Sequence, residues 1–186
     1  MLAFLPEKIS RREIRARLGR AFEDRLQRIF TSHADPGYYT IRDVVAYGIG
    51  ECERSRIAAD RLEQEDLKGF GELMLLSHDG DRVNGQPAIQ PATAEGHAEC
   101  LHRLIGAYAC STPNIDKMID IVRVIPGVYG AQLAGAGLGG CVMILARQSA
   151  VPRIKTALAR EYYRALGLPP TVWRVRPVTG GGIVRP

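Results

Sequence analysis

Four glycines fall within six consecutive positions, Gly135 to Gly140, and this run is the densest candidate for phosphate chemistry in the sequence. Gly135, Gly137 and Gly140 satisfy G-x-G-x-x-G, a pattern that lets backbone approach a pyrophosphate in dinucleotide-binding folds. That fold needs a helix directly after the glycines, whose first amides receive the pyrophosphate. Here the strand-like run 141–145 follows instead. We therefore exclude a dinucleotide fingerprint.

Two interpretations of the glycine run remain open. The sequence has no G-x-x-x-x-G-K-[ST], so the run is not a P-loop. The glycines permit positive φ and close backbone approach, which suits a tight hairpin packed under a neighbouring segment. Successive amides in such a loop can also form a nest that binds an anion.

Other chemically capable side chains are weaker candidates. His97, Cys100 and His102 could share a helix face, but the sequence places no fourth ligand, so we interpret them as surface residues. The run D79-G-D81 resembles the start of a calcium loop without its remaining ligands, and we expect a turn there. His78 has no nucleophile beside it, so we predict a structural hydrogen-bonding role.

The elements that would position these residues are mostly helical in the first part of the chain. Apolar residues recur every four positions from Ile14 to Phe30 and predict one helix over 10–30, followed by a turn. Thr40 would cap a long helix ending near Leu62, and a shorter helix is expected over 67–77. The glycines and prolines of 78–91 predict a surface loop or insertion.

The second part of the chain mixes helices with short strands. We expect, in order, a helix over 98–108, a helix from Thr112 to Pro126, strands over 128–134 and 141–146, a helix over 152–166, a strand over 171–178 and an extended piece at 183–184. Asp43 and Asp116 lie near helix starts, where they would stabilise the helix ends. This order predicts an α+β fold with an antiparallel, ferredoxin-like sheet backed by helices.

Four ordered stretches give the sequence a family resemblance. The run 126–141, PGVYGAQLAGAGLGGC, closely resembles the third motif of the GHMP small-molecule kinases, with its flanks. The stretches FGELMLLSH (70–78), STPNID (111–116) and IRDVV (41–45) are similar to segments of the galactokinase branch of that family. Asp43 stands where histidine is usual, and 84–107 lengthens one connection, which indicates a divergent member. The chain thus resembles the C-terminal half of a galactokinase-like kinase.

The resemblance implies a domain organisation, cofactors and a site. Residues 1–37 would form a basic amphipathic helix and turn, and 38–186 a GHMP kinase C-terminal domain with an insertion at 84–107. ATP and Mg²⁺ would serve the complete enzyme, and a sugar would be its substrate. The loop that would lie beside the ATP phosphates consists of Gly135, Ala136, Gly137, Leu138, Gly139 and Gly140.

Several family parts are missing from these 186 residues. They are the sugar-binding first motif, the Pro-x-x-x-Gly-Leu-Ser-Ser-Ser phosphate loop and the aspartate base, so no catalytic residue is predicted here. We expect the chain to phosphorylate no sugar by itself and to need the N-terminal kinase half or another subunit. The alternative is a non-catalytic protein-interaction or regulatory module. In either case an uncovered apolar face would favour homo-oligomers.

Composition narrows the remaining partners. The net charge is +5, and residues 1–30 supply +4 of it through eight basic and four acidic residues. The acids are interspersed and aromatic residues are few, so we interpret this as a solvated helix face and predict no nucleic-acid partner. The sequence shows neither a signal peptide nor a run long enough to span a membrane, and its four cysteines are scattered. We expect a soluble, cytoplasmic protein with reduced thiols and no metal site.

Overall fold

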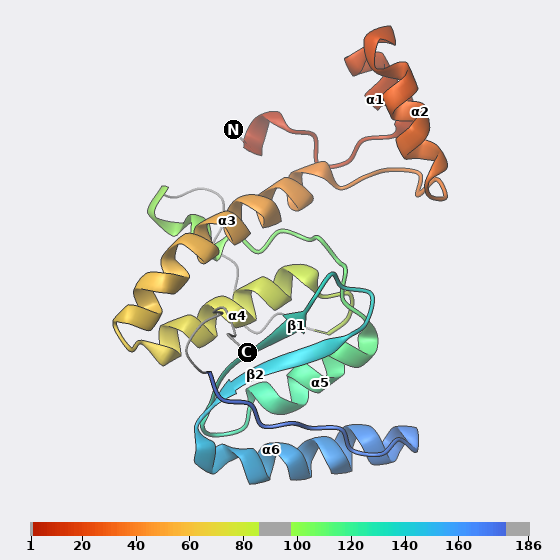
Figure 1. The fold of residues 1–186 in the computed structure, drawn as a ribbon. Coiled ribbons are helices and arrows are strands. Elements are labelled where there is room, and N and C mark those ends of the chain that lie inside the picture. Colours follow the sequence, from red (N-terminus) through yellow and green to blue (C-terminus); the bar gives the residue numbers. More distant parts are fainter. Residues whose placement is uncertain (1, 86–97, 178–186) are drawn as a thin grey trace, which may run out of the picture.

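The computed structural model describes residues 2–85 and 98–177, which form a small sheet covered by helices and a helical pair standing apart from it (Figure 1). The principal elements are α1 (Arg11–Leu18), α2 (Glu23–Thr31), α3 (Ile41–Glu63), α4 (Leu67–Asp81), α5 (Pro113–Arg123), β1 (Val128–Ala134), β2 (Cys141–Ala146) and α6 (Val151–Leu158). Short 3₁₀ turns lie at Leu2–Phe4, Arg20–Phe22, Ala98–Arg103, Gln148–Ala150 and Arg164–Leu166, and a π-helical turn lies at Ala159–Tyr163. None of the helices in the described ranges is both long and apolar enough to cross a bilayer.

Strands β1 and β2 pair antiparallel and form the sheet of the described residues. Their register runs from Val128 opposite Ala146 to Ala134 opposite Cys141, and one irregularity falls between Val128 and Gly130. One sheet face packs against α5 and α6, and these side chains form the main core: Ile119, Val122, Ala131, Leu133, Ile154 and Leu158. Helix α4 lies on the other side of β1 (Figure 1). The predicted α+β class and the strands predicted over 128–134 and 141–146 are confirmed.

Local sequence signals explain several helix ends. Thr112 caps α5, because its hydroxyl accepts a hydrogen bond from the Ile115 amide at 3.3 Å, and Pro113 occupies the first helical position. After α6 the chain remains helical to Leu166, and Gly167 ends it with a left-handed φ of 65°. The helices predicted from these caps are therefore present.

The single helix predicted over 10–30 is wrong, because Gly19 breaks it. Gly19 has φ of 72°, and its amide donates to the Arg15 carbonyl at the end of α1. The chain then folds back, so that Arg15 reaches Glu23 and Gln27 of α2. The regular spacing of apolar residues continues across the break and hides it, whereas the glycine itself was a usable stop signal.

Two further predictions fail. The expected helix over 98–108 is only a 3₁₀ turn ending at Arg103, because Gly106 and Ala109 adopt positive φ values of 62° and 57°. Residues 171–177 alternate like a strand but pair with no neighbour among the described residues. The extended piece predicted at 183–184 lies outside the described residues.

Helix α4 approaches β1 closely at Gly71, and this contact holds the helix against the sheet. A Cβ on Gly71 would collide with the carbonyl of Tyr129 and the amide of Gly130. We expect Gly71→Ala to lower the free energy of unfolding by about 2–3 kcal/mol, measured by urea denaturation. Lys68→Ala, on the exposed side of α4, should change it by less than about 0.5 kcal/mol. Equal effects of the two variants would contradict this packing.

Candidate functional site

The glycine loop, residues 135–140, is a hairpin connection held almost entirely in left-handed backbone conformations. Positive φ values occur at Gly135 (101°), Gly137 (91°), Leu138 (60°), Gly139 (129°) and Gly140 (103°). Residues other than glycine rarely adopt such φ values, so the four glycines are needed for this path of the chain. Leu138 is the exception, and its side chain is 85% exposed.

One point of the loop is anchored to residue 110. The amide of Leu138 donates to the carbonyl oxygen of Cys110 at 2.6 Å. A Cβ on Gly137 would collide with that same carbonyl and with the Cys110 sulfur. Gly137 is therefore the residue that lets the loop lie directly against Cys110.

A buried polar network lies beneath Cys110. Its thiol donates to Oδ1 of Asp81 at 3.0 Å, and the hydroxyl of Tyr47 donates to Oδ2 at 2.9 Å. Burial and the Asp81 carboxylate raise the pKa of Cys110 to about 12, so the thiol remains protonated and acts as a donor. Burial also raises the pKa of Asp81, while the bonds from Cys110 and Tyr47 oppose that rise.

The segment carrying Cys110 is itself fixed by the end of α4. The amides of Tyr108 and Ala109 both donate to the carbonyl of Gly80, at 2.7 and 3.1 Å, and the Ser111 amide donates to the Asp81 carbonyl at 2.8 Å. The ring of Tyr108 stacks on that of Tyr47 in α3, with centroids 5.2 Å apart. Helices α3 and α4 therefore determine where the glycine loop lies.

The other side of the glycine loop is open. Within residues 98–177, the amides of Ala136, Gly137 and Gly139 donate to no backbone carbonyl. A Cβ on Gly135 or Gly139 would meet nothing within 4 Å. Successive free amides in a turn can form a backbone nest that binds an anion. The contact with Cys110 supports the tight-hairpin interpretation, and the anion nest stays a prediction.

His78 belongs to a separate buried cluster at the end of α4. Its Nε2 lies 3.3 Å from Oδ1 of Asp116, and the side chain is almost fully buried. The other carboxylate oxygen of Asp116 accepts from the amides of Val83 and Asn84 at 3.0 and 2.7 Å. Asp116 therefore holds the chain as it leaves α4, while Thr112 caps its own helix.

The two weak metal candidates provide no metal site among the described residues. Asp79–Asp81 form the last turn of α4, so the turn predicted there, and the start of the predicted surface loop at residue 78, are wrong. Asp79 pairs with Arg82 at 3.3 Å, and Asp81 belongs to the network under Cys110. No group of three or more His, Cys, Asp or Glu side chains converges in the described ranges. His97 lies outside them.

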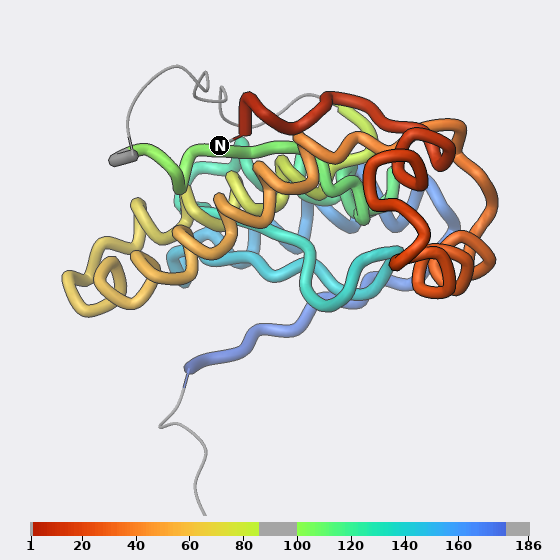
Figure 2. The backbone as a smooth tube through the Cα atoms, turned by 90° about the horizontal axis from the view of Figure 1, so that it is seen from above, coloured from red at the N-terminus to blue at the C-terminus, as the bar shows by residue number. Residues whose placement is uncertain are grey.

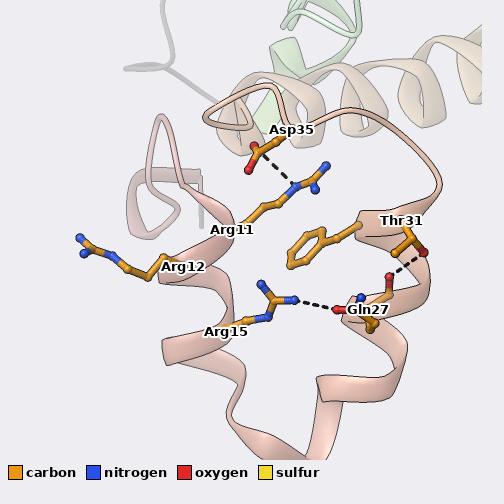
Figure 3. Close-up of a pocket in the computed structure, with 7 residues that line it drawn as sticks. Arg11, Arg12, Arg15, Gln27, Thr31 and Asp35 are labelled. Atoms are coloured by element: carbon orange, nitrogen blue, oxygen red, sulfur yellow. Dashed lines mark hydrogen bonds and ion pairs between the residues drawn. The ribbon is translucent and has the colours of Figure 1, made fainter.

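A pocket of about 490 Å³ between α1 and α2 is lined by Arg11, Arg12 and Arg15, and two of these arginines are held by partners within the protein (Figure 3). Arg11 donates to the hydroxyl of Tyr39 and to two carbonyls, and lies 3.6 Å from Asp35. Arg15 bonds to Glu23 and Gln27, and both guanidinium groups stack on Phe30. Arg11 and Arg15 therefore hold the helical pair together.

The family to which the chain belongs follows from comparison with known protein families. The model of the family described as GHMP kinases C terminal matches residues 58–165, more than half of the chain. The chain belongs to the GHMP kinase C-terminal family. The predicted relationship and fold class are therefore confirmed.

Similar proteins are galactokinases. A galactokinase from Bos taurus is 30% identical over 115 residues, which cover 62% of this chain and 24% of that protein. A crystal structure of Lactococcus lactis galactokinase complexed with galactose is 25% identical, with a TM-score of 0.45, covering 63% of this chain and 24% of that one. The matched part thus spans about a quarter of the length of these relatives.

The contact between the loop and Cys110 predicts different costs for two glycine substitutions. Both Gly135→Ala and Gly137→Ala place a side chain at positive φ, which costs about 1–2 kcal/mol. Only Gly137→Ala adds a collision with Cys110, so we expect it to be less stable than Gly135→Ala by about 2 kcal/mol in thermal unfolding. Indistinguishable melting temperatures would mean that the loop does not rest on Cys110.

The buried histidine predicts a pH dependence of stability. Burial lowers the pKa of His78 from 6.5 to about 4, helped by the charge of Arg82. The unfolded chain therefore takes up a proton near pH 6.5 that the folded chain resists until about pH 4, and stability falls across that window as pH decreases.

Between pH 7 and pH 4.5 the free energy of unfolding should fall by about 2 kcal/mol less in His78→Asn than in the wild type, measured by urea unfolding at pH 7, 6, 5 and 4.5. The slope with pH is the readout, since the variant is also less stable at every pH. His33→Asn, at an exposed histidine, should keep the wild-type slope. An unchanged slope in His78→Asn would refute the assignment.

Proposed function

We propose that this chain acts as the C-terminal domain of a galactokinase-like, ATP-dependent sugar kinase and contributes the glycine loop to binding of the ATP phosphates. The observation that carries the proposal is the set of free amides at Ala136, Gly137 and Gly139, in a loop fixed by Cys110. Family membership and the similarity to galactokinases support it. The sugar and the remaining contacts belong to the complete enzyme.

The loop suits a phosphate for physical reasons. In phosphoryl transfer a sugar oxygen attacks the γ-phosphorus, ADP leaves, and charge neutralisation by donors and Mg²⁺ lowers the barrier. Rigid amides that already point at the phosphate lose little entropy on binding. Because the described residues offer no metal cluster, we propose that Mg²⁺ is held by ATP and by the rest of the enzyme.

We propose that the 186 residues alone do not catalyse this reaction. The sequence contains no Pro-x-x-x-Gly-Leu-Ser-Ser-Ser stretch, and the glycine loop offers neither a base nor a sugar contact. The free cysteines Cys52, Cys100, Cys110 and Cys141 agree with the reducing, ATP-containing cytoplasm as the place of action.

A second candidate, a non-catalytic interaction module, is favoured by the apolar side chains beside the loop. Leu138 and Met143 are exposed on neighbouring parts of the β1–β2 hairpin. In the kinase proposal the same residues are covered by the N-terminal half. The two candidates therefore differ in whether ATP is turned over when that half is supplied.

The test combines this protein with the N-terminal half of a galactokinase, which carries the phosphate-loop sequence and lacks the C-terminal domain. We expect no galactose phosphorylation by the 186-residue protein and ATP-dependent phosphorylation by the mixture, followed by ADP release. Phosphorylation by the protein alone would overturn its proposed dependence on a partner. Stable binding of the two polypeptides without turnover would favour the interaction module.

Charge substitution in the active mixture tests whether the loop faces the phosphates. Leu138→Glu adds a negative charge at an exposed side chain and should raise KM for ATP about 5–10-fold. Leu138→Gln, with the same shape and no charge, should stay within about twofold. If the two variants have equal KM values for ATP, the ATP phosphates do not bind beside the glycine loop.

A further inference from the structure

We propose that two copies of this chain pair through antiparallel α3 helices, so that a basic helical arm of each copy contacts an acidic helix end of the other. The arm is α1 and α2, residues 11–31, and the acidic end is the last turn of α3 with the residues after it, 60–67. The proposal concerns assembly and does not depend on kinase activity.

The outer face of α3 is a continuous exposed stripe of small residues with an apolar side chain at each end. Its members are Val44, Gly48, Cys52, Ser55, Ala59 and Leu62, which follow one another at helical spacing. A Cβ on Gly48 would meet nothing within 4 Å. The opposite face, with Gly50 and Arg54, is buried against residues 102–104. Small side chains allow two helices to approach closely, so the stripe is shaped for another helix.

The order of residues in the stripe suits an antiparallel partner of the same sequence. A two-fold axis between Cys52 and Ser55 sets Val44 opposite Leu62 and Gly48 opposite Ala59. Small residues then face small residues, and the apolar ends pack on each other. Such a pairing is self-complementary and closes as a dimer.

Charge at the two ends of α3 favours the same arrangement. On the arm, Arg20, Arg25 and Arg28 are exposed and make no ion pair among the described contacts. At the acidic end, Asp60 and Glu63 are likewise exposed and without a salt bridge in the described residues, as is Glu65.

The arm and the acidic end lie at opposite ends of α3. The arm stands beyond its amino end, and its carboxyl end continues into α4 on the far side of the molecule (Figures 1 and 2). Antiparallel pairing therefore brings the arginines of one copy to the carboxylates of the other. Exposed apolar residues accompany both sets of charges, with Phe22 and Ile29 on the arm and Leu62 and Leu67 at the acidic end.

Sedimentation equilibrium of the 186-residue protein tests the pairing. A 20.4 kDa chain should give twice that mass at micromolar concentrations, with dissociation promoted by 0.5 M NaCl. The variant Arg20→Glu, Arg25→Glu, Arg28→Glu and the variant Asp60→Lys, Glu63→Lys, Glu65→Lys should each weaken dimerisation at least tenfold. Combining all six substitutions should restore it, because the attractive pairs are re-formed with exchanged signs.

Cross-linking locates the axis. A short bismaleimide should join two copies through Cys52, and Cys52→Ser should abolish the product. Cys141→Ser, at the other exposed cysteine of the described surface, should leave it unchanged. A monomer at 200 µM, a dimer indifferent to the charge exchange, or cross-linking through Cys141 in place of Cys52 would each overturn the proposal.

Discussion

The glycine loop depends on one contact, the seating of Gly137 and Leu138 on the backbone of Cys110. Without it the hairpin between β1 and β2 would be free to sample many conformations, because glycines resist ordering more than other residues. The hydrogen bond to the Cys110 carbonyl fixes one point of the loop. The amides of Ala136, Gly137 and Gly139 are then held in place, and within the described residues they donate to no backbone carbonyl.

That contact is supported from below by groups distant in sequence. Asp81 receives the Cys110 thiol and the Tyr47 hydroxyl, and the raised pKa of the thiol keeps it in the donor state. A buried carboxylate with two donors is stabilised only while both are present, so the network favours one arrangement of α3, α4 and the 105–111 segment. The position of the loop is therefore determined by the helices rather than by the hairpin alone.

Sequence patterns predicted the local structure well where one residue decides the outcome. The limits of both strands, the Thr112 cap and the glycine loop follow from alternation, capping and glycine content. The break at Gly19 was missed because apolar spacing was preferred over the glycine stop signal. The irregular path of 104–111 depends on positive φ at Ala109, which no residue type demands. Cys110, Asp81 and Tyr47 meet only through tertiary packing, so no pattern could reveal them as the support of the loop.

In the proposed enzyme the free amides of the glycine loop receive the ATP phosphates. Amide chemical shifts of ¹⁵N-labelled protein, paired with a galactokinase polypeptide carrying the phosphate loop, test it most directly during titration with Mg²⁺ and ATP. We expect the largest downfield proton shifts at Ala136, Gly137 and Gly139, and a smaller one at Leu138, whose amide is already bonded to Cys110. Shifts confined to residues outside 135–140 would contradict it.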